Sequence, residues 1–175
     1  DVHFRTFARL REIIAKLRSP EGCPWDREQT HESLRKYLIE ETFEAVEAID
    51  EGDMEALRDE LGDVLLQIML HAQIGEEDGD FDISDVIAKI SEKMVRRHPH
   101  VFGDVRADNV ETVLANWQQI KAEERAAAGR AEPPASVLDG VPSGLPALMK
   151  AAELQKKAAK VGFDWDHPAA VSEKI

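Results

Sequence analysis

The sequence predicts an all-α fold arranged as an antiparallel helical bundle. Apolar residues recur every three or four positions in several long segments, which is the spacing of amphipathic helices. Residues that cap or stop helices lie between these segments. No segment alternates apolar and polar residues over the length of a strand, since Val101-Phe102 and Val137-Leu138 are too short. Short connections between the first four helices favour antiparallel neighbours.

The first two predicted helices flank a loop. Residues 4–18 carry apolar side chains on one side, and the following Ser19-Pro20 stops this helix. Residues 23–26, Cys-Pro-Trp-Asp, are expected to form the loop. Thr30 is an N-cap candidate for a second helix that runs to about residue 50.

The third and fourth predicted helices follow closely. Gly52 is expected to end the second helix and Asp53 to cap the third, which breaks at residues 78–80. Asp82 can cap the fourth helix, which should end before His98 because Pro99 disfavours helical backbone there. The side chains expected to point inward from it are Ile83, Val86, Ile87, Ile90 and Met94.

The remainder of the chain predicts a second, smaller part. A fifth helix covers residues 109–128, and a proline-rich linker occupies residues 131–146. A helix over residues 147–161 then leads to Trp165-Asp166, which repeats Trp25-Asp26. We therefore expect a domain over residues 1–130, and over residues 147–175 the start of a second, truncated copy of that domain.

Composition excludes several classes of protein. The 175 residues carry a net charge of −13, which argues against nucleic acid or an anionic membrane as partner. No apolar run has the length of a membrane span, and no signal peptide is expected. The single cysteine, Cys23, rules out an intrachain disulfide and fits a reducing, cytoplasmic location.

Two pairs of acidic residues lie at helical spacing on the second and third predicted helices. Glu41 and Glu44 are three residues apart, and so are Glu60 and Asp63. Positions three apart share one face of a helix, so each pair projects in one direction. Four convergent carboxylates suit a hard, oxygen-binding cation such as Mg²⁺ or Mn²⁺.

The second pair indicates a metal site more strongly than the first. Its helix is apolar almost all the way round from residue 61 to residue 70, which is typical of a buried helix. Buried carboxylates need a partner. The same-face neighbour one turn after Asp63 is Gln67 rather than a basic residue, and Arg58 lies roughly opposite. The alternative is an ordinary solvated face of glutamates.

Basic and aromatic residues offer a place for a nucleotide. Lys93, Arg96 and Arg97 lie at helical spacing and could hold a phosphate chain, although cations are also favourable at a helix C-terminus. Trp117 and Lys121 are four apart, so the ring could stack a base while the lysine reaches a phosphate. Trp117 also continues an apolar stripe, and a core position is the alternative.

These motifs together resemble the MazG nucleoside triphosphate pyrophosphohydrolases. Residues 40–44, EETFE, and residues 60–63, ELGD, resemble the family's E-E-x-x-E and E-x-x-D signature. Residues 22–26, 96–102 and 117–121 are also similar to MazG segments. The family is all-α, assembles at least as dimers built from four-helix units, and cleaves nucleoside triphosphates with Mg²⁺ into monophosphate and pyrophosphate. Its longer members are tandem duplications.

The resemblance implies a role for each candidate residue. Glu40 would orient the attacking water, and Lys93, Arg96 and Arg97 would contact the triphosphate. Trp117 and Lys121 would contact the base side and phosphates. The residues implied as Mg²⁺ ligands are Glu41, Glu44, Glu60 and Asp63.

Three other readings stay open at this point. Some MazG domains carry lysine where this chain has Tyr37 and Ala56, so this copy could be a weakly active or binding-only dimerisation module. A carboxylate-bridged di-iron bundle would need two Glu-x-x-His motifs, and only Glu28 to His31 fits. A relative tuned to dUTP or to a phosphoribosyl-nucleotide is the third.

Overall fold

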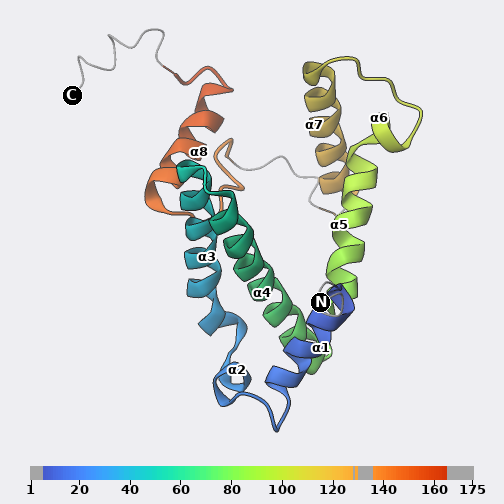
Figure 1. The fold of residues 1–175 in the computed structure, drawn as a ribbon. Coiled ribbons are helices and arrows are strands. Elements are labelled where there is room, and N and C mark those ends of the chain that lie inside the picture. The colour runs from blue at the N-terminus through green and yellow to red at the C-terminus, as the bar shows by residue number, and fades with distance from the viewer. Residues whose placement is uncertain (1–5, 128, 130–135, 165–175) are drawn as a thin grey trace, which may run out of the picture. The chain divides into compact units, whose positions relative to one another are not determined.

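The computed structural model describes residues 6–127, 129 and 136–164, and it divides the chain into two units, residues 1–105 and 106–175 (Figure 1). All regular structure in these described ranges is helical, which confirms the all-α class. The first unit contains α1 (Phe7–Arg18), α2 (Pro24–Glu28), α3 (His31–Glu51), α4 (Met54–Asp78), α5 (Ile83–Arg97) and α6 (Pro99–Phe102). The second contains α7 (Val110–Ala127) and α8 (Ala147–Ala159).

The hairpin of α3 and α4 is the central element of the first unit. Thr30 and Ser33 form a capping box at the start of α3. Gly52 ends α3 with a φ of 71°, a left-handed conformation that glycine adopts without strain. The carboxylate of Asp53 then accepts hydrogen bonds from the backbone N–H groups of Glu55 and Ala56, both at 3.0 Å. These local signals turn the chain back, so α3 and α4 run antiparallel side by side (Figure 1).

Two details at the start of the chain differ from expectation. The first helix begins at Phe7 rather than at residue 4, because the side chain of Thr6 caps it by accepting from the N–H of Arg9; Phe4 lies outside the described residues. The expected loop at residues 23–26 is wrong, since α2 starts at Pro24. Proline suits the first position of a helix, where no N–H partner is needed.

The core lies where α1 and the beginnings of α3 and α5 meet the C-terminal half of α4. That half is buried, whereas Leu61 near the N-terminal end of α4 is 55% exposed. The expectation that this helix is buried all along is therefore wrong for its acidic half. The core residues are Ile14, Leu34, Met69, Leu70, Ala72, Ile74 and Ile83.

Helix α5 leaves the end of α4 and diverges from the α3–α4 hairpin (Figure 1). Asp82 caps it as expected, with its carboxylate bonded to the N–H of Asp85. Of the side chains expected to point inward, Ile83 is buried and Val86 packs against the core, but Ile87, Ile90 and Met94 are 44%, 46% and 38% exposed. This expectation is wrong for the latter three, because no described element of the first unit covers the outer half of α5.

The second unit begins with α7, and the side chain of Asn109 accepts a hydrogen bond from the N–H of Thr112 in its first turn. Helix α8 agrees with the predicted helix over residues 147–161. Trp165-Asp166 lies outside the described residues, and the expected boundaries at 130 and 147 stay predictions. None of the described helices is both long and apolar enough to cross a membrane.

Candidate metal centre

Three carboxylates from the two helices of the hairpin converge. Glu41 comes from α3, and Glu60 and Asp63 come from one face of α4. One oxygen of each lies within 4.8 Å of an oxygen of the other two. The two acidic segments were predicted to converge, and these three residues do so. Oxygen donors at this spacing could hold a divalent cation.

Partial burial and, after it, mutual repulsion raise the pKa of two of these carboxyl groups. Partial burial is the main cause that raises the pKa of Glu41, followed by the charges of Asp63, Glu44 and Glu60. The pKa of Glu60 is raised by partial burial and then by Glu44, Asp63 and Asp59. Like charges gathered in one place favour protonation, so a positive ion would relieve the site.

The acids are less buried than the sequence predicted. Glu41 and Glu60 are half-buried, while Glu44 and Asp63 are exposed. Asp63 was expected to be buried, and that expectation is wrong for the single chain, while its role as a metal ligand stays a prediction. The reason is that α1 and α5 pack with the core residues of the other half of α4, whereas the described part of the first unit covers this half less completely.

The other two candidate acids lie beside the group of three. Glu44 does not belong to the group of three carboxylates whose oxygens lie within 4.8 Å of one another, yet it is close enough to raise the pKa of both Glu41 and Glu60. Glu40 is exposed on α3, one residue before Glu41, and therefore points about 100° away around the helix axis. Their assigned roles stay predictions.

Sequence reasoning noted Gln67 as a neighbour of the acids but assigned it no role. Its side chain is 5% exposed, and its carbonyl oxygen Oε1 has no hydrogen-bond partner among the described residues. An amide on an otherwise apolar helix, one turn from an acidic residue, is the signal that could have identified it.

The basic trio lies on α5. Lys93 and Arg97 are half-buried, and Arg96 is exposed. Because α5 diverges from α4, the trio at its C-terminal end stands away from the hairpin within one chain (Figure 1). Its contact with a triphosphate stays a prediction.

The aromatic and basic pair of α7 belongs to the second unit. The Lys121 ammonium lies 4.5 Å from the centroid of the Trp117 ring, a cation–π arrangement. Trp117 is half-buried. The two side chains thus meet as their spacing predicted, and their role in binding a nucleotide stays a prediction.

The histidines do not support a di-iron centre. Glu28 ends α2 and His31 begins α3, so the single Glu-x-x-His match is divided between two helices. Moreover, the Nδ1 atoms of His31 and His71 are 2.7 Å apart and their rings are stacked at 5.0 Å. Burial and then the charge of His31 lower the pKa of His71, which favours the neutral form of the His71 ring.

Tyr37 occupies one of the two positions where some MazG domains carry lysine. Its ring makes an edge contact with Trp25 at 5.7 Å between centroids. The ammonium of the preceding residue, Lys36, lies 4.4 Å from the Tyr37 centroid. A positive charge is therefore present beside this position even though the residue itself is aromatic.

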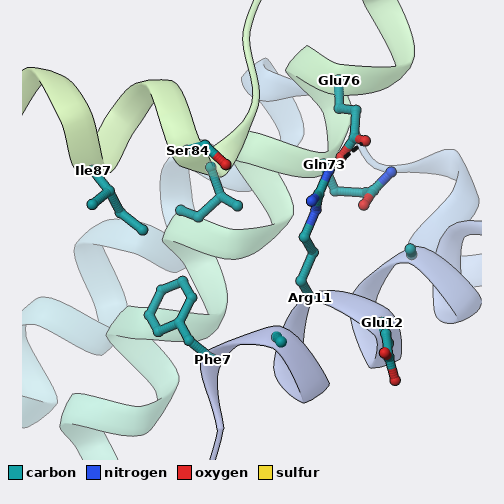
Figure 2. A pocket seen from close by; sticks show the side chains of 10 residues that line it. Phe7, Arg11, Glu12, Gln73, Glu76, Ser84 and Ile87 are labelled. Atoms are coloured by element: carbon teal, nitrogen blue, oxygen red, sulfur yellow. Dashed lines mark hydrogen bonds and ion pairs between the residues drawn. The ribbon is translucent and has the colours of Figure 1, made fainter.

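A pocket of ≈ 500 Å³ lies elsewhere in the first unit, between α1, α4 and α5. Figure 2 shows Arg11 reaching to Glu76, with which it forms an ion pair at 2.7 Å, while Phe7 and Ile87 line the apolar side. Arg11 also lies 3.6 Å from Asp82. The converging acids do not line this pocket.

Comparison with known proteins places these features in a family. Residues 29–102 match the model of the MazG nucleotide pyrophosphohydrolase domain. The chain is 49% identical to the nucleoside triphosphate pyrophosphohydrolase of Escherichia coli (strain K12), covering 95% of this chain and 62% of that protein. It is 50% identical to the nucleoside triphosphate pyrophosphohydrolase/pyrophosphatase MazG of Thermotoga maritima, covering 97% and 63%.

A solved structure agrees with the fold. The crystal structure of a mazG-related protein from Thermotoga maritima aligns with a TM-score of 0.56 and 32% identity, over 65% of this chain and 97% of that one. The chain spans 30% to 63% of the length of the curated relatives it matches.

Proposed function

The chain belongs to the MazG nucleotide pyrophosphohydrolase family, and we propose that it hydrolyses nucleoside triphosphates to a monophosphate and pyrophosphate with Mg²⁺, or Mn²⁺ in its place. The names of the relatives from Escherichia coli and Thermotoga maritima support this activity. The proposed role is control or cleansing of the cytoplasmic nucleotide pool.

The observation that carries the proposal is the meeting of Glu41, Glu60 and Asp63 within 4.8 Å. Carboxylate oxygens are the donors that Mg²⁺ and Mn²⁺ prefer, and the raised pKa values of Glu41 and Glu60 mark a place that favours positive charge. We assign Glu44 as the fourth ligand. Neutralisation of the charge on phosphoryl oxygens is what a bound divalent cation supplies.

The chain's own side chains supply the remaining functions in this proposal. Glu40 accepts a hydrogen bond from the attacking water and orients it in line with the scissile phosphorus. Lys93, Arg96 and Arg97 bind the phosphate chain and stabilise the leaving pyrophosphate. Trp117 stacks on the base, and Lys121 contacts a phosphate.

We further propose that the protein is a homodimer, or a larger assembly, in which a second chain completes the four-helix unit. The apolar side chains that the single chain leaves exposed on α3, α4 and α5 support this. A partner would cover them and also enclose the exposed acids. They include Ile39, Phe43, Leu61, Ile68, Ile87, Ile90 and Met94.

A binding-only module is the second candidate, and Tyr37 and Ala56 favour it. In that case the chain binds a nucleotide with Mg²⁺ but turns it over slowly. From the net charge of −13 we further propose that nucleic acid is not a partner.

A panel of nucleotides with product analysis tests the proposal. We expect monophosphate and pyrophosphate in the presence of Mg²⁺ and none with a chelator. Release of orthophosphate with a diphosphate would contradict the proposed reaction. If turnover is absent, Mg²⁺-dependent nucleotide binding supports the binding-only alternative, and its absence rejects both.

A further inference from the structure

Gln67 is a buried polar side chain whose carbonyl oxygen has no hydrogen-bond partner in the described part of the chain. It lies on α4, is 5% exposed, and is surrounded in sequence by the apolar residues of that helix. Its Oε1 accepts no hydrogen bond from the described residues. Buried carbonyl groups are nearly always paired with protein, water or a ligand, because leaving one unpaired is costly.

The place of Gln67 on α4 directs it toward the acidic cluster. It follows Asp63 by four residues and Glu60 by seven, and seven residues return to within about 20° of the same direction. Side chains of a helix lean toward its N-terminus, so the amide leans toward these acids. Since α3 runs antiparallel, the side chain of Glu41 leans the opposite way, toward the level of Gln67.

Along α4, Gln67 thus comes between the acids Glu60 and Asp63 and the core residues Met69 and Leu70. A neutral carbonyl oxygen there can accept hydrogen bonds without adding to the repulsion among the carboxylates. The last torsion of a glutamine side chain is soft and nearly two-fold, so the oxygen can turn toward the acidic side.

We propose that Gln67 is a positioning residue of the metal centre, and this rests on the proposed function. Its carbonyl oxygen accepts a hydrogen bond from a water of hydration of the cation that Glu41, Glu60 and Asp63 hold. This contact fixes the inner side of the hydrated ion relative to the carboxylates. Outer contacts of this kind typically change metal affinity by about 10- to 100-fold when removed.

Binding of Mn²⁺ to the full chain, followed by the electron paramagnetic resonance of the free ion, tests the proposal without relying on catalysis. Gln67→Met keeps the length of the side chain but removes the acceptor, and Gln67→Asn keeps an amide but withdraws its oxygen by one methylene. We expect each to weaken Mn²⁺ binding by about tenfold or more. The cation-free melting temperature of Gln67→Met should equal or exceed that of the parent, because an unpaired acceptor is removed.

Gln73→Met is the matched control, since Gln73 lies on the same helix and donates to Glu77 at 3.2 Å. It should bind Mn²⁺ as the parent does. Asp63→Asn reports on the cluster itself and should lose binding. A parent that binds no Mn²⁺ overturns both the metal centre and the role of Gln67.

If the parent and Asp63→Asn behave as expected but both Gln67 variants bind Mn²⁺ like the parent, only the Gln67 proposal fails. A cation-free melting temperature that falls while Mn²⁺ binding is unchanged would make Gln67 a structural residue and would also overturn it. Should Gln67→Met not fold, the Gln67→Asn measurement alone decides.

Discussion

The carboxyl groups of Glu41 and Glu60 show how single residues set the electrostatics of this protein. Each has a pKa above the ordinary value of 4.5, so each binds its proton more tightly in the folded chain than in the unfolded one. The stability that this provides is present below pH 4.5 and is lost as the pH rises through the folded pKa. At neutral pH the cation-free hairpin therefore contains unrelieved repulsion, which a bound cation would remove.

Replacing Asp63 by asparagine should separate the two consequences of this repulsion. The cation-free Asp63→Asn protein should melt at or above the temperature of the parent, because one negative charge is gone. It should lose most of the Mg²⁺-induced rise in melting temperature, which for a cation at 100 times its Kd corresponds to about 2.7 kcal/mol. Thermal melts with and without Mg²⁺ measure both effects.

Asp50→Asn, at the exposed end of α3, is the control and should keep the full Mg²⁺-induced rise in melting temperature. The same full rise in Asp63→Asn would show that Asp63 is not a ligand.

The His31–His71 pair should make stability depend on pH near neutrality. The pKa of His71 is below its ordinary value of 6.5 because of burial and the charge of His31. The unfolded chain thus binds more protons in this range, so stability is complete above pH 6.5 and falls as the pH drops through the folded pKa. Urea unfolding between about pH 5 and about pH 8 measures this. His71→Asn should flatten the profile and His98→Asn should not; an unchanged slope in His71→Asn would assign it to another group.

At the scale of elements, the hairpin depends on Arg18 for its attachment to α1 and α2. The Arg18 side chain is 6% exposed. Its Nε donates a hydrogen bond to the Glu77 carboxylate at 3.0 Å, and its Nη2 donates another at 2.7 Å. It also donates to the backbone carbonyls of Asp26 and Gln29. One planar guanidinium therefore joins the ends of α1, α2 and α4, a geometry that lysine cannot reproduce.

Arg18→Met should lower the free energy of unfolding by about 2 kcal/mol, because it removes a buried guanidinium that donates to the Glu77 carboxylate and to two backbone carbonyls. The free energy of unfolding of Arg18→Lys should lie between those of Arg18→Met and the parent. Urea unfolding monitored by circular dichroism gives the values. The exposed Arg9–Glu12 pair provides the control: Arg9→Met should cost less than about 1 kcal/mol. Equal losses in the free energy of unfolding for Arg18→Met and Arg9→Met would show that Arg18 contributes no more than an exposed ion pair.

A second prediction at the scale of elements concerns the basic trio at the C-terminal end of α5. Arg97→Ala and Arg96→Ala should each weaken Mg²⁺-nucleotide binding by about tenfold, which is about 1.4 kcal/mol for a lost charged contact to phosphate. Their helical circular dichroism should equal that of the parent. Lys89→Ala, on the same helix but outside the trio, should bind as the parent does. If the two arginine variants also bind the nucleotide like the parent, the trio only stabilises the C-terminal end of α5 through the helix dipole.

The whole first unit is open on one side, because α5 diverges and leaves its apolar face exposed. Ile90 is 46% exposed in the single chain, so a charge there should not disturb the fold of one chain. If a partner covers it, the same charge becomes buried and unpaired.

Ile90→Glu should therefore shift the protein from dimer to monomer, raising the dimer Kd by about 30-fold or more, which is about 2 kcal/mol. Sedimentation of both proteins at micromolar concentration measures the change. Lys89→Glu places the same carboxylate on a neighbouring face, with a larger change in net charge, and this variant should stay dimeric. A parent that sediments as a monomer would reject the assembly.

The sequence by itself determined the helices and their limits. Thr30, Gly52, Asp53 and Asp82 act through hydrogen bonds and backbone conformations within a few residues, so their positions could be read directly. The exceptions are the start of α1 at Phe7 and the short helices α2 and α6, which were not predicted because a proline that begins a short helix resembles a loop. Spacing also predicted that Glu60 and Asp63 share a face, since helix geometry alone decides it.

Only the tertiary structure decided which of these faces are covered and which side chains meet. Burial depends on elements far apart in sequence, so an apolar stripe could not show that Ile90 is exposed or that Asp63 faces solvent. The same holds for the three carboxylates within 4.8 Å, because the register of α3 against α4 sets that distance. The burial of the Gln67 oxygen without a partner among the described residues and the His31–His71 contact likewise arise from packing between helices, which no local pattern encodes.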